Sequence, residues 1–79
     1  MVEKKLDLRG FACPIPVLKV NKEIRGLDED DIVICEVTDP AAPDDFKNFC
    51  NTTGNVLLNC ERTGDCWVIT IEKSRQRSG

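Results

Sequence analysis

The chain has 79 residues, with 11 Lys or Arg against 14 Asp or Glu, so its net charge is −3. This length suffices for one small domain and excludes a second independent core. The apolar share of 41% is typical of a chain that folds. The acidic balance, with three Phe, one Trp and no Tyr, argues against a dedicated nucleic-acid binder, which needs a basic stripe and aromatic side chains for stacking.

The sequence predicts a cytoplasmic protein with reduced thiols. No stretch approaches the roughly 18–20 apolar residues of a membrane span. The first seven residues, 1–7, have no apolar run behind their lysines and do not resemble a signal peptide. Because the five cysteines are odd in number and accompany no export signal, a disulfide scaffold is disfavoured.

The chain contains no histidine. This absence excludes a Cys-His nucleophile pair, a Ser-His-Asp triad, any zinc site with histidine ligands and the usual general base near neutral pH. A zinc site made of cysteines alone is weakly supported, because no two cysteines form a Cys-X-X-Cys pair. We therefore predict no metal.

The first half of the chain predicts a strand, a helix and a second strand. Residues 4–9 alternate polar and apolar, which places Leu6 and Leu8 on one face of a short strand that Gly10 ends. From residue 14 to about residue 27, apolar residues recur at helical spacing, and they are Val17, Val20, Ile24 and Leu27 with Leu18 beside them. An acidic connection at 28–31 leads to a strand at 32–38, whose predicted interior face is Val33, Cys35 and Val37.

The second half predicts a helix and a hairpin. Residues 39–42 form a loop, Pro43 suits the first position of a helix, and Gly54 ends that helix. Its apolar face is predicted to hold Phe46, Phe49, Cys50 and Thr53, and Asp44 and Asp45 complement its positive N-terminal end. Strands at 56–62 and 66–73 follow, with Val56, Leu58 and Cys60 expected to face the same core as Trp67, Ile69 and Ile71. Residues 1–73 thus form one domain, and 74–79 are expected to be a flexible tail.

The element order β-α-β-α-β-β predicts a two-layer α/β (α+β) sandwich. Its simplest closure is a four-stranded mixed sheet with two helices on one face. Both helix starts and the loop at 39–42 then lie at the same edge of the sheet. We expect ligand or partner contacts at that edge.

Cys13 is the strongest candidate for chemistry. It falls at or next to the start of the first helix, where Pro14 presets a helical φ and Pro16 lies in the first turn. The positive helix end and the amides of Ile15 and Val17 would favour a thiolate, with Arg9 as a nearby cation. The alternative is that Cys13 is a small buried residue that fits the turn.

The segment Asp7-Leu8-Arg9-Gly10, followed by Cys13-Pro14-Ile15-Pro16, resembles the TusA/SirA family of small sulfur carrier proteins. The turn at Asp39-Pro40-Ala41 and the pair Phe49-Cys50 support the resemblance, which covers about residues 6–73. It implies that Cys13 carries a persulfide, with Arg9, Gly10, Pro14, Ile15, Pro16 and Asp39 as supporting residues. It also implies a two-layer α/β sandwich and no cofactor beyond the covalent persulfide.

The same resemblance implies the partners. Sulfur would come from a cysteine desulfurase or another sulfurtransferase and pass to a downstream acceptor, in one branch toward tRNA 2-thiolation. The carrier would act stoichiometrically in a relay rather than as a stand-alone enzyme. We expect a monomer, without direct nucleic-acid or membrane binding, that docks through exposed Phe11, Ile15, Pro40 and Pro43.

Two other functions stay open. The chain could be a non-catalytic interaction or regulatory module in which Cys13 is structural, and Asp39 could serve only an Asx turn. A redox protein would need a second thiol near Cys13. Cys50 lies about seven residues into the second helix, on the order of 10 Å along its axis, too far for a disulfide. Cys35 and Cys60 are expected in the interior, and Cys66 is the best candidate for a second exposed thiol.

Overall fold

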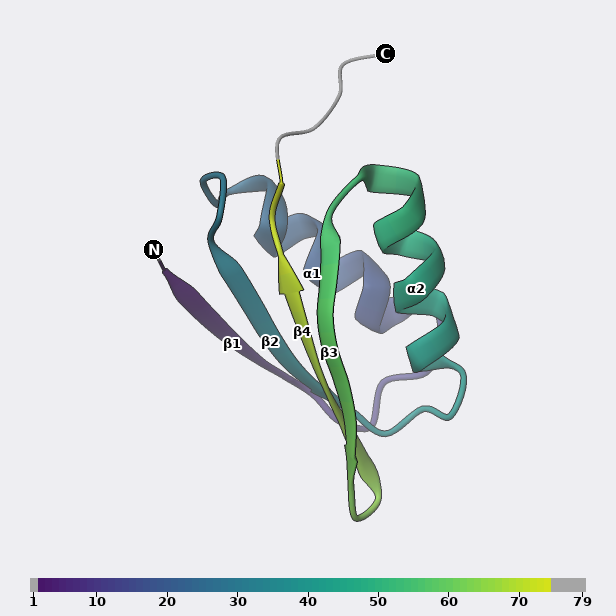
Figure 1. The fold of residues 1–79 in the computed structure, drawn as a ribbon. Coiled ribbons are helices and arrows are strands. Elements are labelled where there is room, and N and C mark those ends of the chain that lie inside the picture. Colours follow the sequence, from purple (N-terminus) through teal and green to yellow (C-terminus); the bar gives the residue numbers. More distant parts are fainter. Residues whose placement is uncertain (1, 75–79) are drawn as a thin grey trace.

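A computed structural model describes residues 2–74 and confirms the predicted fold class. The elements are β1 (Glu3–Leu8), α1 (Ile15–Arg25), β2 (Ile32–Val37), α2 (Ala42–Thr53), β3 (Val56–Thr63) and β4 (Cys66–Glu72). The strands form one sheet in the order β1-β2-β4-β3. β1 and β2 are parallel, and the β2–β4 and β3–β4 pairs are antiparallel. Both helices cover the same face of the sheet (Figure 1).

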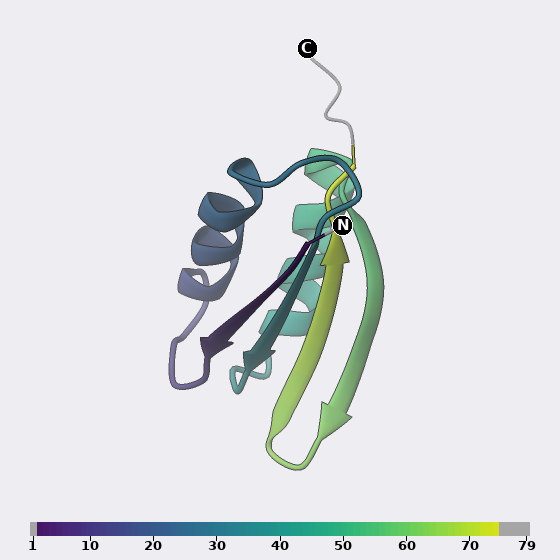
Figure 2. The same ribbon diagram turned by 90° about the vertical axis from the view of Figure 1, so that its left-hand side faces the viewer.

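The parallel strands end at the same edge. β1 pairs with β2 from Glu3 opposite Ile32 to Leu8 opposite Val37. The connections that leave these two strands therefore start side by side, and each leads into a helix (Figure 2). The predicted meeting of both helix starts at one edge is confirmed.

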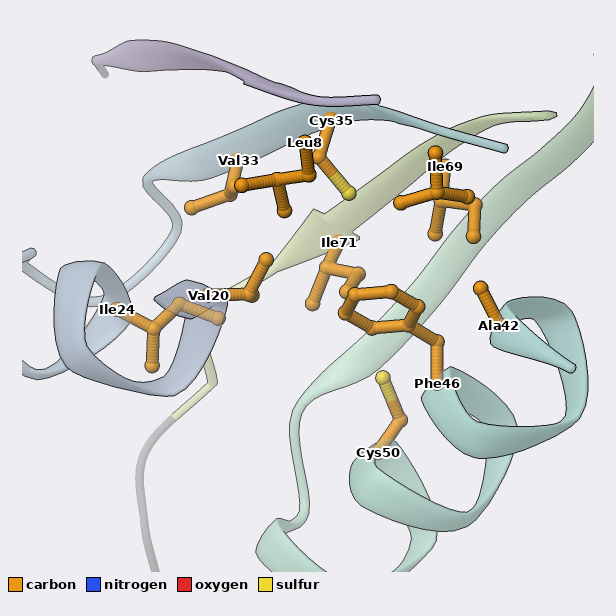
Figure 3. Packing of buried hydrophobic residues seen from close by; sticks show 11 residues of the cluster. Leu8, Val20, Ile24, Val33, Cys35, Ala42, Phe46, Cys50, Ile69 and Ile71 are labelled. Atoms are coloured by element: carbon orange, nitrogen blue, oxygen red, sulfur yellow. The ribbon is translucent and has the colours of Figure 1, made fainter. Parts of the chain in front are cut away.

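The core lies between the helices and the sheet. β2 contributes Val33, Cys35 and Val37, as predicted, and all three are fully buried. Phe46 of α2 lies at the centre of the cluster, between Ile71 and Cys50 (Figure 3). Partly buried side chains surround this cluster, and they are Leu6, Val17, Leu27, Phe49, Leu57 and Trp67.

The buried face of α1 agrees with the prediction except at Leu18. Val20 and Ile24 are buried as expected, but Leu18 is 56% exposed and Pro16 is buried instead. At about 100° per residue, Leu18 lies roughly 200° around the helix from Val20. Pro16, four residues before Val20, lies on the buried face.

The face assignment of β3 is wrong for Val56 and Leu58, which are 41% and 48% exposed. The register with β4 shifts between Leu57 and Asn59, so one extra residue reverses the alternation of faces. Leu57, opposite Ile71, faces the helices instead.

Cys60 is also exposed, although its partner Ile69 is buried. β3 is an edge strand, and the β3–β4 hairpin extends past the beginning of α2 (Figure 1). No helix of the described chain covers the hairpin beyond that point (Figure 1). Trp67, Ile69 and Ile71 of β4 contribute to the core as predicted.

Asp31 lies at the end of the sheet opposite the helix starts. It is buried, although the sequence predicts a polar connection at 28–31. Its Oδ1 accepts the Val2 N–H at 2.9 Å, and its Oδ2 accepts the Asp28 N–H at 2.9 Å. Lys73 Nζ donates to the Leu27 carbonyl at 2.7 Å. These bonds join the N-terminal strand, the connection at 28–31 and the end of β4.

The predicted tail lies mostly outside the described residues, since 75–79 are not among them. Ser74, the one described member, donates through its N–H to Asn55 Oδ1 at 3.2 Å and through its hydroxyl to the Gly54 carbonyl. Gly54 itself adopts φ 85° and ends α2, as predicted. Neither helix within residues 2–74 is long and apolar enough to cross a membrane.

Replacing Phe46 by Ala should lower the free energy of unfolding by about 3–5 kcal/mol, because a fully buried aromatic side chain leaves a cavity. Urea denaturation followed by circular dichroism measures the change. Phe11→Ala is the matched control, since Phe11 is 40% exposed and should cost much less. Equal losses in the two variants would contradict the described core.

Asp31 should make the free energy of unfolding depend on pH. The backbone N–H groups of Asp28 and Val2 hold the pKa of its carboxyl below the ordinary value. A folded pKa below the unfolded value, near 3.9, stabilises the fold above that pH and loses this contribution as pH falls through the folded pKa.

Asp31→Asn should therefore unfold at lower urea than the parent chain at pH 7. The difference between the two should shrink as the pH falls below 4. Urea midpoints measured from pH 7 to pH 2 test this expectation. A constant difference over that range would show that the Asp31 charge is not involved.

Candidate functional site

Cys13 lies in the segment that joins β1 to α1, and it is exposed. Pro14 is the N-cap of α1, which begins at Ile15, and the Cys13–Pro14 peptide bond is cis. Cys13 thus stands next to the N-cap, as predicted, whereas Pro14 precedes the first helical position instead of occupying it. Pro16 is buried in the first turn and anchors this end of the helix against the core.

Two hydrogen bonds hold the Cys13 segment to the end of β2. The Gly10 N–H donates to Thr38 Oγ1 at 2.9 Å, and the Cys13 N–H donates to Asp39 Oδ2 at 2.5 Å. Gly10 has φ 87°, a conformation that side chains with a Cβ rarely adopt. Asp39 Oδ1 accepts the Ala41 N–H at 3.1 Å, so Asp39 makes the expected Asx turn and also binds the Cys13 backbone.

α2 places a second carboxylate, that of Asp45, beside the Asp39 loop, where the Asp45 N–H donates to the Ala41 carbonyl at 3.1 Å. Asp45 lies in the first turn of α2 and is half-buried. A hydrogen bond with Asp45 is the largest cause that raises the pKa of the Cys13 thiol above its ordinary value, followed by loss of hydration and the negative charges of Asp45 and Asp39. The sequence analysis assigns Asp45 only to the helix terminus. The predicted meeting of both helix starts was the one signal for its proximity to Cys13.

The expectation of a lowered pKa for Cys13 is wrong in direction. The Ile15 N–H, expected to face the sulfur, donates to the Ala12 carbonyl at 2.9 Å. Arg9 is bound to Asp7, with Nε 2.9 Å from Oδ1 and a second guanidinium nitrogen 2.9 Å from Oδ2. This pair lowers the pKa of Asp7 to about 2 and raises that of Arg9. The Ile15 amide and the Arg9 guanidinium therefore bind other partners and not the sulfur.

All five cysteines are free, and they differ in accessibility. Burial raises the pKa of Cys35 to about 12 and that of Cys50 to about 11, so these thiols are unreactive core residues. Cys66, the expected second exposed thiol, is half-buried, while Cys60, expected in the interior, is exposed. Cys13 and Cys60 are thus the two most accessible thiols.

Apolar side chains surround Cys13 on the surface. Phe11 and Ile15 are 40% and 39% exposed, Pro40 is exposed and Pro43 is half-buried. Lys19 Nζ lies 4.9 Å from the centre of the Phe11 ring. A shallow groove between β1 and α1 adjoins this rim, and its lining includes Leu6, Leu8, Phe11, Lys19, Lys22 and Glu23. Within residues 2–74, no three Cys, Asp or Glu side chains are placed to hold a metal ion.

Comparison with known proteins identifies the family. A family model described as Sulfurtransferase TusA matches residues 4–73, nearly the whole chain. The chain belongs to the TusA family. The TusA match includes the loop after β1, with Cys13, and the loop after β2, with Asp39. It also covers all six helices and strands, except the first residue of β1.

Relatives of similar length agree with the TusA assignment. A candidate sulfur carrier protein of Neisseria meningitidis serogroup B is 32% identical over 72 residues, which cover 91% of this chain and 97% of the relative. The sulfur carrier protein TusA of Allochromatium vinosum is 31% identical, covering 91% of this chain and 95% of the relative. Membership of the TusA family thus supports a sulfur carrier role.

Replacing Asp39 by Ala should release the Cys13 segment from β2. Hydrogen bonds to charged groups contribute about 1.5–3 kcal/mol, and the low end of that range suits an exposed bond. The Cys13 amide should then exchange with solvent roughly tenfold faster, as measured by NMR hydrogen exchange. The control is Asp44→Ala, an exposed aspartate of α2, which should leave that exchange rate unchanged. Protection that survives Asp39→Ala would refute the bond.

Proposed function

We propose that Cys13 is the residue that carries sulfur, as a persulfide, between a donor and an acceptor protein. The observation that supports this most directly is the placement of an exposed thiol at the edge where both helix-forming loops meet. Its backbone is fixed by Asp39, which gives the sulfur a defined position on an otherwise open surface. A relay needs such exposure, since two different partners must reach the same atom.

The transfer step needs no cofactor and no external oxidant. The Cys13 thiolate attacks the terminal sulfur of a donor persulfide, a new S–S bond forms at Cys13, and the S–S bond of the donor breaks. The donor cysteine leaves as a thiolate and takes up the proton that Cys13 lost. The onward step repeats this exchange with Cys13 as the leaving thiolate, so the absence of histidine is no obstacle.

The rim around Cys13 is the proposed docking surface. Phe11 and Ile15 are each two residues from Cys13, and Pro40 follows Asp39. All three are exposed and offer apolar area to a partner. The donor is a cysteine desulfurase or another sulfurtransferase, and the acceptor is a downstream sulfur-accepting protein, for example one that serves tRNA 2-thiolation. The carrier works as a monomer, and its free cysteines suit the reducing cytoplasm.

One observation favours a second candidate function, a non-catalytic interaction module. The carboxylates of Asp45 and Asp39 raise the pKa of the Cys13 thiol. A raised pKa disfavours the thiolate in the isolated chain, as expected if Cys13 were only structural. The two functions differ in whether Cys13 ever accepts sulfur.

Cys13→Ser should abolish sulfur loading, because a hydroxyl cannot form a persulfide. The chain is incubated with a cysteine desulfurase and cysteine, and its intact mass is measured after trapping of free thiols. The parent chain should gain the mass of a sulfur atom, mapped to the Cys13 peptide and removed by reductant.

Cys60→Ser is the matched control, since it removes the other exposed thiol and should leave loading unchanged. Loading of Cys13→Ser at the parent level would rule out the carrier role of this residue. Failure of the parent chain to load from a desulfurase and from a persulfide-bearing sulfurtransferase would favour the interaction module.

A further inference from the structure

β1 has one unpaired edge. It is an outer strand of the sheet, and within residues 2–74 it pairs only with β2. The Ile32 N–H donates to the Val2 carbonyl at 2.8 Å, which fixes the alternation of the parallel ladder. The even-numbered residues of β1 therefore direct their N–H and C=O groups to β2, and Glu3, Lys5 and Asp7 direct theirs to the free edge. Figure 2 views the sheet from the side of this edge.

The groove between β1 and α1 adjoins the free edge. Its volume is about 400 Å³, and its lining includes the apolar side chains Leu6, Leu8 and Phe11. Leu6 and Phe11 are partly exposed there. Phe11 also belongs to the apolar rim beside the thiol, so the groove and the rim are continuous. A segment that entered the groove would therefore lie next to the proposed sulfur site.

The groove carries uncompensated positive charge. Lys19 and Lys22 of α1 line it, and neither forms an ion pair with a carboxylate of residues 2–74. The two carboxylates of the lining, Asp7 and Glu23, are each paired with a cation of the chain. The contact of Lys19 with the Phe11 ring keeps this cation at the groove without neutralising it. An acidic ligand is complementary to this surface, although the chain as a whole has a net charge of −3.

We propose that an extended segment of a partner protein adds to β1 as a further strand and directs apolar and acidic side chains into the groove. Its backbone pairs with the free groups of Glu3, Lys5 and Asp7. Its carboxylates bind Lys19 and Lys22. This inference rests on the proposed function, since the partner is a donor or an acceptor of sulfur. It adds the chemistry by which that partner is recognised and held beside the thiol.

A second copy of this chain does not fit the groove. Side chains alternate along a strand, and the helix-facing positions of β1 include Lys4, Leu6 and Leu8. A second β1 would thus bring a lysine and no carboxylate to Lys19 and Lys22. Like charges disfavour such a pairing. The occupant is therefore a different protein that supplies the acidic side chains.

Hydrogen exchange followed by NMR in the full-length chain tests strand addition. The probe is a synthetic peptide of alternating valine and glutamate, about six residues long as in a typical strand. At a peptide concentration about ten times the Kd, the Lys5 and Asp7 amides should exchange about tenfold more slowly, because exchange then occurs in the free fraction. The Lys4 and Leu6 amides, which face β2, should change by less.

A peptide of alternating valine and lysine is the control for charge. No protection of the Lys5 and Asp7 amides by millimolar glutamate peptide, or equal protection by the lysine peptide, would overturn the proposal. Protection that rises with the concentration of the chain alone, without peptide, would show self-association and would also overturn it.

Two variants separate the charge from the backbone pairing. Lys22→Glu should weaken binding of the glutamate peptide about tenfold, since an attraction becomes a repulsion. Its matched control is Lys47→Glu, at an exposed position of α2 outside the groove, which should bind as the parent chain does. Lys5→Pro removes an N–H that faces the free edge and should abolish protection of Asp7, whereas Lys5→Ala should retain it. Circular dichroism shows whether each variant is folded.

The peptide experiment needs no sulfur transfer, so its outcome is independent of the chemistry at Cys13. A parent chain that binds the glutamate peptide in the groove but accepts no sulfur would refute the carrier role of Cys13 and support the docking site. A parent chain that loads sulfur normally, yet shows no protection of the β1 edge, would overturn the strand addition alone.

Discussion

The pairing of β1 with β2 is the constraint on which the site depends. Because the two strands are parallel and end together, at Leu8 and Val37, their following loops meet at one edge. Two hydrogen bonds, from the Gly10 N–H to Thr38 and from the Cys13 N–H to Asp39, then join the loops. An antiparallel pairing would send these loops to opposite edges and separate the thiol from both carboxylates.

Periodicity along the chain predicts most of this fold. The alternation in β2 and the helical spacing around Val20 and Phe46 each identify a buried face correctly. β3 is misread because a single extra residue between Leu57 and Asn59 reverses its faces. No Gly or Pro lies between these residues to mark such a shift in the sequence, and the exposure of an edge strand depends on neighbours elsewhere in the chain.

The sequence predicts where Cys13 lies, but not which groups affect the ionisation of its thiol. A cysteine followed by proline at the start of a helix, together with the element order, places Cys13 at the same edge as Asp39. Local reasoning then assigns Arg9 and the Ile15 amide to the sulfur, whereas Asp7 and the Ala12 carbonyl bind them. The ionisation of a thiol depends on groups from several segments, and here the dominant one is Asp45, 32 positions away in the chain.

The irregularity in β3 also bears on how copies of this protein meet one another. β3 is an outer strand of an open sheet, and it carries the exposed apolar side chains Val56 and Leu58. A flat outer strand of this kind offers its free N–H and C=O groups as a template for a strand of another molecule. The extra residue bends and twists the strand locally. The protein thus keeps an apolar outer strand while resisting its growth into a shared, intermolecular sheet.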